Sequence, residues 1–204
     1  RLQLPITSYK PLRARRLVRQ AYDYSCGAAA IATLLTYVLQ DPITEAEVLQ
    51  QALSVLSEDE EALRKKEGLS LLDLQQIAQA RGHRAQGFRL APSFLPRLHG
   101  PVMVFIKPQH YEHFAVLHGV RGDRVFLADP SRGNIRLPLY AFLDMWLDNT
   151  GQGIIFVIER TDGRSPVILP LPAHLAGQAR PELLSVRQLL EVGTPAVRFP
   201  HLAR

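Results

Sequence analysis

The sequence predicts an α+β domain, with helices packed on a mostly antiparallel sheet. Between Cys26 and Gly82 the apolar residues recur at helical spacing, whereas from His83 to Arg160 they alternate or form short β-branched runs. Helices that come first and strands that follow favour a segregated arrangement over alternating βαβ units. The chain has 204 residues and 47% hydrophobic content, which is enough to bury one ordinary core.

Two helices are predicted at the start of the helical region. The first runs from Cys26 to about Gln40, where an Asp-Pro pair stops it. The second opens with a capping box of Thr44 and Glu47, in which each side chain satisfies the other residue's free backbone N–H. Both boundaries therefore rest on local chemistry as well as on periodicity.

A charged helical segment follows. Glu60 and Arg64 are spaced as an i,i+4 ion pair, and so are Glu61 and Lys65. This composition is typical of a solvated helix face, here ending at Gly68, and a docking patch is the alternative interpretation.

A further helix is predicted from Ser70, its N-cap, to Gly82, with Asp73 at the third helical position. The strands come after it, separated by turn signals. Strands are expected over 83–90, 101–107, 113–120, 124–130, 134–139 and 153–160, with one short helix over 140–148.

Composition divides the chain into three parts. Residues 1–19 form a basic arm, 20–162 the folded domain, and 163–204 a Pro-rich extension with one amphipathic helix over 181–193. Part of the formal net charge of +5 lies in the arm, and such arms can bind nucleic acid, anionic lipid or an acidic partner. No base-reading motif accompanies this arm, so no specific nucleic-acid partner is expected.

Compartment and cofactor are constrained only in part. No apolar run reaches the roughly 18 to 20 residues that a membrane-spanning helix needs, so no transmembrane segment is expected in this chain. The chain begins with Arg, which is compatible with a removed signal peptide. A single cysteine excludes an internal disulfide and a Cys-rich zinc site. His110, Glu112 and His113 match no zinc-protease spacing, so neither metal nor cofactor is expected.

Cys26 is a candidate nucleophile because it stands where a helix begins. The free N–H groups and partial positive charge of a helix N-terminus favour a thiolate. Gly27 permits close approach to Cys26, and Gln20, six residues earlier, offers a side-chain amide for an oxyanion hole. The alternative is a buried structural cysteine that packs as a small apolar residue.

A nucleophilic cysteine needs a histidine base and a group that orients it. If the strands over 113–120 and 124–130 form a hairpin, the start of one lies beside the end of the other. His113 and Asp129 then become neighbours, and the carboxylate can accept the imidazole Nδ1–H. His118 lies at the turn end, far from Asp129, and His110 is in a loop, so the pairing selects His113.

Together these residues resemble the C39 peptidases, the papain-like double-glycine peptidases. The resemblance rests on Gln20, the Cys26-Gly27 pair with its helix, His113 in "HFAVL", and Asp129 before proline, in this order over about residues 16–160. It implies a papain-like cysteine peptidase fold. It also implies that Cys26 attacks the peptide bond, His113 is the base, Asp129 orients it and Gln20 completes the oxyanion hole.

The resemblance also suggests substrates and a location. C39 peptidases cut after leaders that end in Gly-Gly or a similar small-residue pair. Transporter-linked members often carry an acidic residue before the cysteine, where this chain has Ser25, and nothing in the sequence explains that serine. The stretch "RQAYDYSCGAAA" is most similar to the stand-alone peptidases of functional-amyloid (Fap) secretion systems. A periplasmic enzyme is therefore expected, with amyloid subunits and an outer-membrane secretion pore as partners.

Two alternatives stay open at this stage. C39-like modules also occur as substrate-binding or chaperone domains of export systems, with little or no proteolysis. A papain-like site can also hydrolyse other amides or transfer an acyl group to an amine, because the first half-reaction is shared. Retention of Cys26, His113 and Asp129 favours the peptidase.

Overall fold

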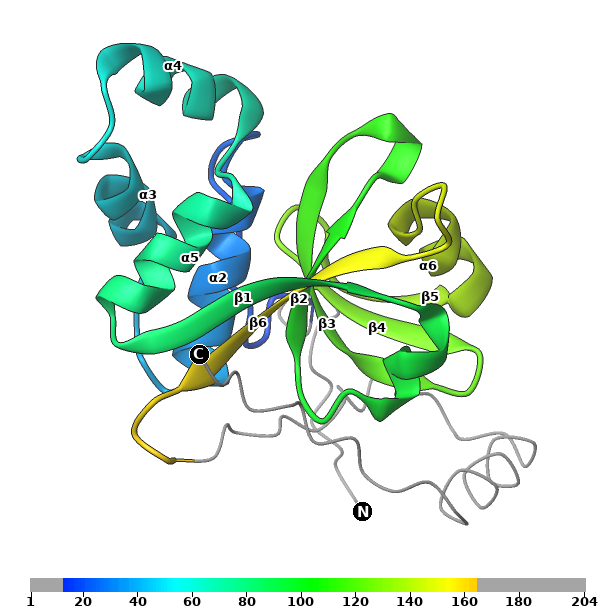
Figure 1. Cartoon of the computed structure of the whole chain (residues 1–204). Helices are drawn as coiled ribbons and strands as arrows, with labels where there is room; N and C mark the ends of the chain where they lie inside the picture. Colours follow the sequence, from blue (N-terminus) through cyan, green and yellow to red (C-terminus); the bar gives the residue numbers. More distant parts are fainter. Residues whose placement is uncertain (1–12, 165–204) are drawn as a thin grey trace, which may run out of the picture.

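Six antiparallel strands form one sheet, in the order β1-β6-β2-β3-β4-β5, and helices cover both of its faces (Figure 1). The structure is a computed structural model, and it describes residues 13–164. The predicted helix over 181–193 and residues 1–12 of the arm lie outside the described residues.

The elements follow the predicted order, helices first and strands after. The helices are α2 (Cys26–Tyr37), α3 (Glu45–Leu53), α4 (Glu58–Glu67), α5 (Leu71–Ala80) and α6 (Leu139–Trp146), with short 3₁₀ turns η1 (Pro92–Arg97) and η2 (Pro108–His110). The strands are β1 (His83–Leu90), β2 (Val102–Ile106), β3 (His113–Arg121), β4 (Arg124–Asp129), β5 (Gly133–Pro138) and β6 (Gly153–Arg160). The α+β prediction is therefore confirmed.

Helix α2 is the central helix of the fold. Its residues from Cys26 to Leu35 are all buried, and an all-round apolar helix of this kind belongs in a core. It ends at Tyr37, earlier than predicted, because Gln40 adopts a positive φ of 55° and the Asp41 N–H turns back to the Leu35 carbonyl. Among the described residues, no helix is long and apolar enough to cross a membrane.

Capping boxes begin the next three helices. The predicted box Thr44–Glu47 and the predicted N-cap Ser70 are confirmed; Ser70 also forms a box with Asp73, and Ser57 forms a third with Glu60. The expected ion pair between Glu60 and Arg64 was a wrong prediction. The Glu60 carboxylate instead accepts hydrogen bonds from Ser57 and so caps its own helix.

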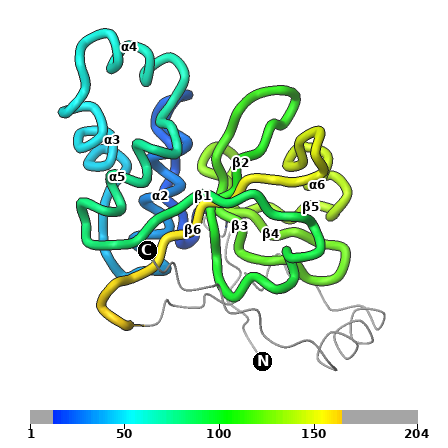
Figure 2. Tube along the Cα trace, in the orientation of Figure 1, coloured from blue at the N-terminus to red at the C-terminus, as the bar shows by residue number. Residues whose placement is uncertain are grey.

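The other charges of α4 follow from this arrangement. Arg64 instead contacts Asp73 at the start of α5, with Nε 2.6 Å from Oδ2, and so joins two helices. The expected Glu61–Lys65 pair is present at 2.5 Å. No residue of α4 is buried, and the tube in Figure 2 shows this helix at the far end of the helical group, which agrees with a solvated helix and leaves the docking patch as an open alternative.

The sheet separates two apolar clusters. Phe114 and Val116 of β3 belong to the cluster packed around α2, α3 and α5, whereas Ala115 and Leu117 belong to the one packed on α6. This alternation follows from the two-residue period of side chains along a strand. Figure 1 shows α2–α5 gathered on one side and α6 on the other. The start of β3 thus lies against the central helix.

The described part of the basic arm packs on the body of the protein. Leu17 is buried, and the Val18 N–H donates to the Thr33 hydroxyl of α2 at 3.0 Å. The guanidinium of Arg19 donates to the Ser131 carbonyl in the turn between β4 and β5. The chain therefore approaches Cys26 along a fixed path between α2 and that turn.

Candidate active site

Cys26 lies in an open cleft of about 850 Å³. Three segments line it: the loop before α2, the end of α4, and the loop between η2 and β3. The lining residues are Ala21, Tyr22, Asp23, Tyr24, Cys26, Lys65, Lys66, Glu67, His110, Tyr111 and Glu112. A nucleophile that lines such a cleft can meet an extended peptide.

Cys26 is the first residue of α2, as predicted. Ser25, the N-cap, makes no side-chain hydrogen bond to the first turn, so the N–H groups at the helix start keep their partial positive charge. A Cβ on Gly27 would lie 3.2 Å from the Phe114 ring, which is tighter than ordinary packing. Glycine therefore lets the start of α2 approach the start of β3, where His113 stands.

Ser25, which the sequence left unexplained, closes the turn before the nucleophile. Its fully buried hydroxyl donates to the Tyr22 carbonyl at 2.8 Å and accepts from the Tyr22 N–H at 3.1 Å. Ala21, the residue before Tyr22, is also fixed, because its N–H donates to Glu45 Oε1 at 2.8 Å. The loop leading into Cys26 is thus fixed by hydrogen bonds to its own turn and to α3.

His113 and Asp129 lie together at the ends of neighbouring strands. The hairpin pairs Val116 with Ala128, and His113 Nε2 lies 3.0 Å from Asp129 Oδ1. The structure therefore differs from the expected Nδ1 contact. Since Nε2 faces Asp129, Nδ1 is the ring nitrogen left to interact with Cys26, which contributes to the raised pKa of His113.

The surroundings keep this pair charged. Burial alone would lower the pKa of His113, but hydrogen bonds to Asp129 and Cys26 and the negative charges on both outweigh it and raise the pKa to about 9. Burial likewise would raise the pKa of Asp129, yet the His113 contact brings it well below its usual range. At neutral pH the arrangement therefore favours an imidazolium paired with a carboxylate.

Asp129 is itself held by the turn that follows it. Its Oδ1 accepts the backbone N–H groups of Ser131 and Arg132 at 2.9 and 3.0 Å, and Oδ2 accepts Arg132 Nε at 3.0 Å. The turn-capping role that the Asp-Pro sequence suggested and the contact with His113 thus coexist in one side chain.

Gln20 lies in the same loop, but its side chain bonds to Tyr22. The Gln20 Nε2 donates to the Tyr22 carbonyl at 2.9 Å, and the backbone N–H of Gln20 donates to the Pro130 carbonyl at 3.2 Å. An amide nitrogen carries two N–H groups, so the bond to Tyr22 uses one of them. Its Oε1 is buried and has no hydrogen-bond partner among residues 13–164.

The competing histidines have different surroundings. Burial lowers the pKa of His118 to about 4 despite a hydrogen bond to Asn134, so this ring is neutral at pH 7. His110 lines the cleft and adopts a positive φ of 68°. Within the described part of the chain, His113 is the histidine that contacts Asp129, and no group of His, Cys, Asp and Glu side chains could hold a metal ion.

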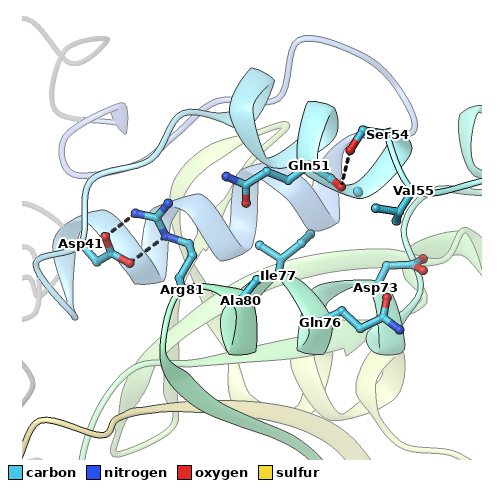
Figure 3. Close-up of a pocket in the computed structure, with 10 residues that line it drawn as sticks. Asp41, Gln51, Ser54, Val55, Asp73, Gln76, Ile77, Ala80 and Arg81 are labelled. Atoms are coloured by element: carbon cyan, nitrogen blue, oxygen red, sulfur yellow. Dashed lines mark hydrogen bonds and ion pairs between the residues drawn. The ribbon is translucent and has the colours of Figure 1, made fainter.

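A second cavity, of about 620 Å³, lies between α3 and α5 and contains none of the candidate site residues (Figure 3). Figure 3 shows Ile77 and Ala80 of α5 facing Gln51 of α3, with the Asp41–Arg81 ion pair at one end. It offers apolar walls and paired charges without a nucleophile. The chemistry therefore belongs to the cleft at Cys26.

Comparisons with known proteins assign the class. The sequence model of the peptidase C39 family matches residues 14–161. The match covers well over half of the chain and includes Gln20, Cys26, His113 and Asp129. The chain belongs to the peptidase C39 family.

Two curated relatives carry the same name. "Probable functional amyloid protease FapD" of Pseudomonas aeruginosa is 32% identical over 177 residues, which are 86% of this chain and 74% of the relative. The protein of that name from Pseudomonas fluorescens is 33% identical over 153 residues, 75% of this chain and 64% of the relative. The chain therefore spans less than two thirds of the second relative's length.

A solved structure shares the fold. The crystal structure of a double glycine motif protease from an AMS/PCAT transporter, in complex with the leader peptide, superposes with a TM-score of 0.57. The two are 24% identical, and the superposition covers 71% of this chain and 91% of the other. The C39 peptidase fold expected from the resemblance is confirmed.

Two residues of the site had no place in the sequence-based prediction. The sequence gives no reason for Ser25, and no sequence pattern points to Tyr111, whose hydroxyl donates to the Asp23 carbonyl. A serine next to the candidate nucleophile was a visible signal. No sequence signal marks Tyr111, because its hydrogen bond joins two positions 88 residues apart.

Proposed function

We propose that this protein is a thiol endopeptidase with Cys26 as nucleophile, His113 as acid and base, and Asp129 as the group that orients His113. The observation that carries the proposal is that Cys26, which lines an open cleft, interacts with His113, and that His113 in turn contacts buried Asp129. The raised pKa of His113 supports it, since an imidazolium is the proton donor that amide cleavage needs.

The reaction runs in two halves. The Cys26 thiolate adds to the scissile carbonyl carbon, and the Cys26 N–H at the helix start, with the Gln20 amide, stabilises the oxyanion. The His113 imidazolium gives its proton to the leaving amine as the C–N bond breaks, which leaves a thioester. Neutral His113 then takes a proton from water, which attacks the thioester and releases the carboxylic acid and the thiolate.

The substrate is an exported protein cut after a Gly-Gly-like leader or related site. The family and the leader peptide bound to the solved double glycine motif protease support this. The two relatives named as probable functional amyloid proteases support a role in secretion of functional amyloid subunits, in the periplasm and beside an outer-membrane secretion pore.

Mass spectrometry of a leader peptide ending in Gly-Gly, incubated with the purified chain, tests the proposal. We expect one cut after the second glycine, and a rate lower by on the order of 10⁴-fold or more for Cys26→Ala. Cys26→Ala keeps the fold because alanine fits the space of the thiol, so leader binding by fluorescence anisotropy serves as the control. If the wild type cuts no leader and both proteins bind it equally, the substrate-binding module is the correct function.

The amyloid assignment needs its own experiment. Intact functional-amyloid subunit precursor replaces the leader peptide, and the periplasmic fraction of the producing cells is probed for the protein. Cleavage of the leader peptide without cleavage of the amyloid precursor would keep the peptidase and remove the amyloid role.

A further inference from the structure

Tyr111 bridges two of the three segments that line the cleft. It stands between η2 and β3, two residues before His113, and its hydroxyl donates to the Asp23 carbonyl at 2.8 Å. Asp23 belongs to the loop that leads into Cys26. Both residues line the cleft, so this hydrogen bond joins two of its walls.

The bridge lies next to the reacting groups. The Tyr111 ring centroid is 6.3 Å from that of His113. Partial burial raises the pKa of Tyr111, and the negative charges of Cys26 and Asp23 raise it further, which places the phenol within electrostatic reach of the sulfur. Cys26 is only 6% exposed although the cleft is open, while Tyr111 remains 54% exposed. Tyr111 therefore lines the cleft beside the nucleophile and is also open to solvent.

The backbone before Tyr111 is held in a conformation that side chains disfavour. Gln109 and His110 both have positive φ, at 51° and 68°, in the left-handed region that favours glycine. Strain of this kind persists where the surrounding contacts impose it, and it gathers at functional sites. Here the Lys107 N–H is fixed to the Met145 carbonyl at 2.6 Å, and Lys107 pairs with Glu112 at 2.9 Å. The loop thus presents Tyr111 in one position.

We propose that Tyr111 determines substrate specificity by limiting the cleft beside Cys26 to the width of a bare backbone. This inference rests on the proposed peptidase function. A glycine next to the scissile bond passes the Tyr111–Asp23 bridge, whereas a larger residue must break the hydrogen bond or displace the ring. The preference for small residues is thereby assigned to one side chain.

Thiol labelling tests the width of the cleft without any cleavage. Cys26 is the only cysteine of the chain, so alkylation reports it alone. Tyr111→Phe removes the hydroxyl and keeps the ring, Tyr111→Ala removes both, and Tyr140→Phe, at a 75% exposed tyrosine of α6, is the matched control. The ratio of rate constants for fluorescein maleimide and iodoacetamide measures access for a bulky group and cancels changes in thiolate content.

We expect this ratio to rise about two- to tenfold in Tyr111→Phe, the value of one net hydrogen bond, more in Tyr111→Ala, and not in Tyr140→Phe. Equal ratios in all four proteins would overturn the proposal. Because Tyr111→Phe changes one exposed atom, it gives an answer even if Tyr111→Ala does not fold.

Cleavage then tests specificity. Leader peptides that differ only in the residue before the scissile bond, Gly, Ala or Leu, are compared by kcat/KM. We expect Tyr111→Ala to reduce the preference for Gly over Leu about tenfold or more, because kcat/KM for the Leu peptide increases. An unchanged preference would contradict the role of Tyr111. If the wild type cuts no peptide while the labelling ratio still rises in the Tyr111 variants, Tyr111 does narrow the cleft but the proposed peptidase function is wrong.

Discussion

Two buried histidines of this molecule each contact an aspartate at nearly the same distance. His113 Nε2 lies 3.0 Å from Asp129, and His83 Nε2 lies 2.9 Å from Asp41. Both aspartates also accept hydrogen bonds from an arginine. By contact geometry alone the two pairs are almost equivalent.

They differ in what the second ring nitrogen meets. His113 also interacts with Cys26, which lines the cleft, whereas His83 Nδ1 is buried without a hydrogen-bond partner among the described residues. Asp41 is chiefly a partner of Arg81, whose hydrogen bond lowers the pKa of that carboxyl, and it joins α5 to the chain after α2. A histidine–aspartate pair is therefore a structural connection, and the third group turns one pair into a candidate catalytic unit.

The largest expected effect comes from exchanging each aspartate for its amide. Asp129→Asn should lower kcat by about 10² to 10⁴-fold, because the amide does not stabilise an imidazolium and favours the wrong ring tautomer. Asp41→Asn should leave kcat within about twofold, since Asp41 contacts Arg81 and His83 and no member of the candidate triad. Steady-state cleavage of the leader peptide measures both, and equal losses would remove the distinction between the two pairs.

Stability against pH should report the charged state of His113. Its pKa is raised from 6.5 to about 9 in the folded protein, so the folded state binds this proton more tightly than the unfolded state. The stabilisation is fully present below pH 6.5 and is lost as the pH rises through about 9. Urea unfolding of the wild type and His113→Gln should therefore differ most at pH 6 and least at pH 10. A difference that grows with pH would contradict this assignment.

The pair of His83 and Asp41 should contribute to stability and not to catalysis. Asp41→Asn leaves Arg81 and His83 with a weaker acceptor, and we expect a loss of about 1 to 3 kcal/mol in the free energy of unfolding. In a domain of this size, each 1 kcal/mol corresponds to about 2 to 4 °C in Tm. Calorimetry measures the shift, and a Tm equal to that of the wild type would show that the pair is dispensable.

Ser25 should give the smallest effect. Ser25→Ala removes two hydrogen bonds that close the Tyr22–Ser25 turn, and we expect a loss of about 1 kcal/mol, shared between stability and kcat. Ser25→Thr keeps the hydroxyl and serves as the control. Identical kcat and Tm in Ser25→Ala and the wild type would make the serine incidental.

The fold could be predicted from the sequence because its signals are local. Capping by Thr44 and Ser70, the apolar strands and the turn glycines each act within a few residues. Where a side chain had two partners within reach, the sequence could not decide. Glu60 was expected to pair with Arg64, yet it caps its own helix while Arg64 reaches Asp73.

The candidate site was predictable where a strand hairpin links its parts. Pairing of β3 with β4 places His113 beside Asp129 whatever surrounds them. The contacting nitrogen, Nε2 instead of Nδ1, depends on ring orientation, which no sequence pattern encodes. The Tyr111 bridge depends on two loops that approach each other only in the folded protein.

The central claim is that Cys26, His113 and Asp129 act as one charged unit, and NMR titration of the His113 ring tests it most directly. The ring signal is assigned by its loss in His113→Gln. We predict a pKa of about 9 in the wild type and a lower pKa in Cys26→Ala, where the hydrogen bond and charge of the thiolate are gone. The same titration midpoint in both proteins would contradict the account.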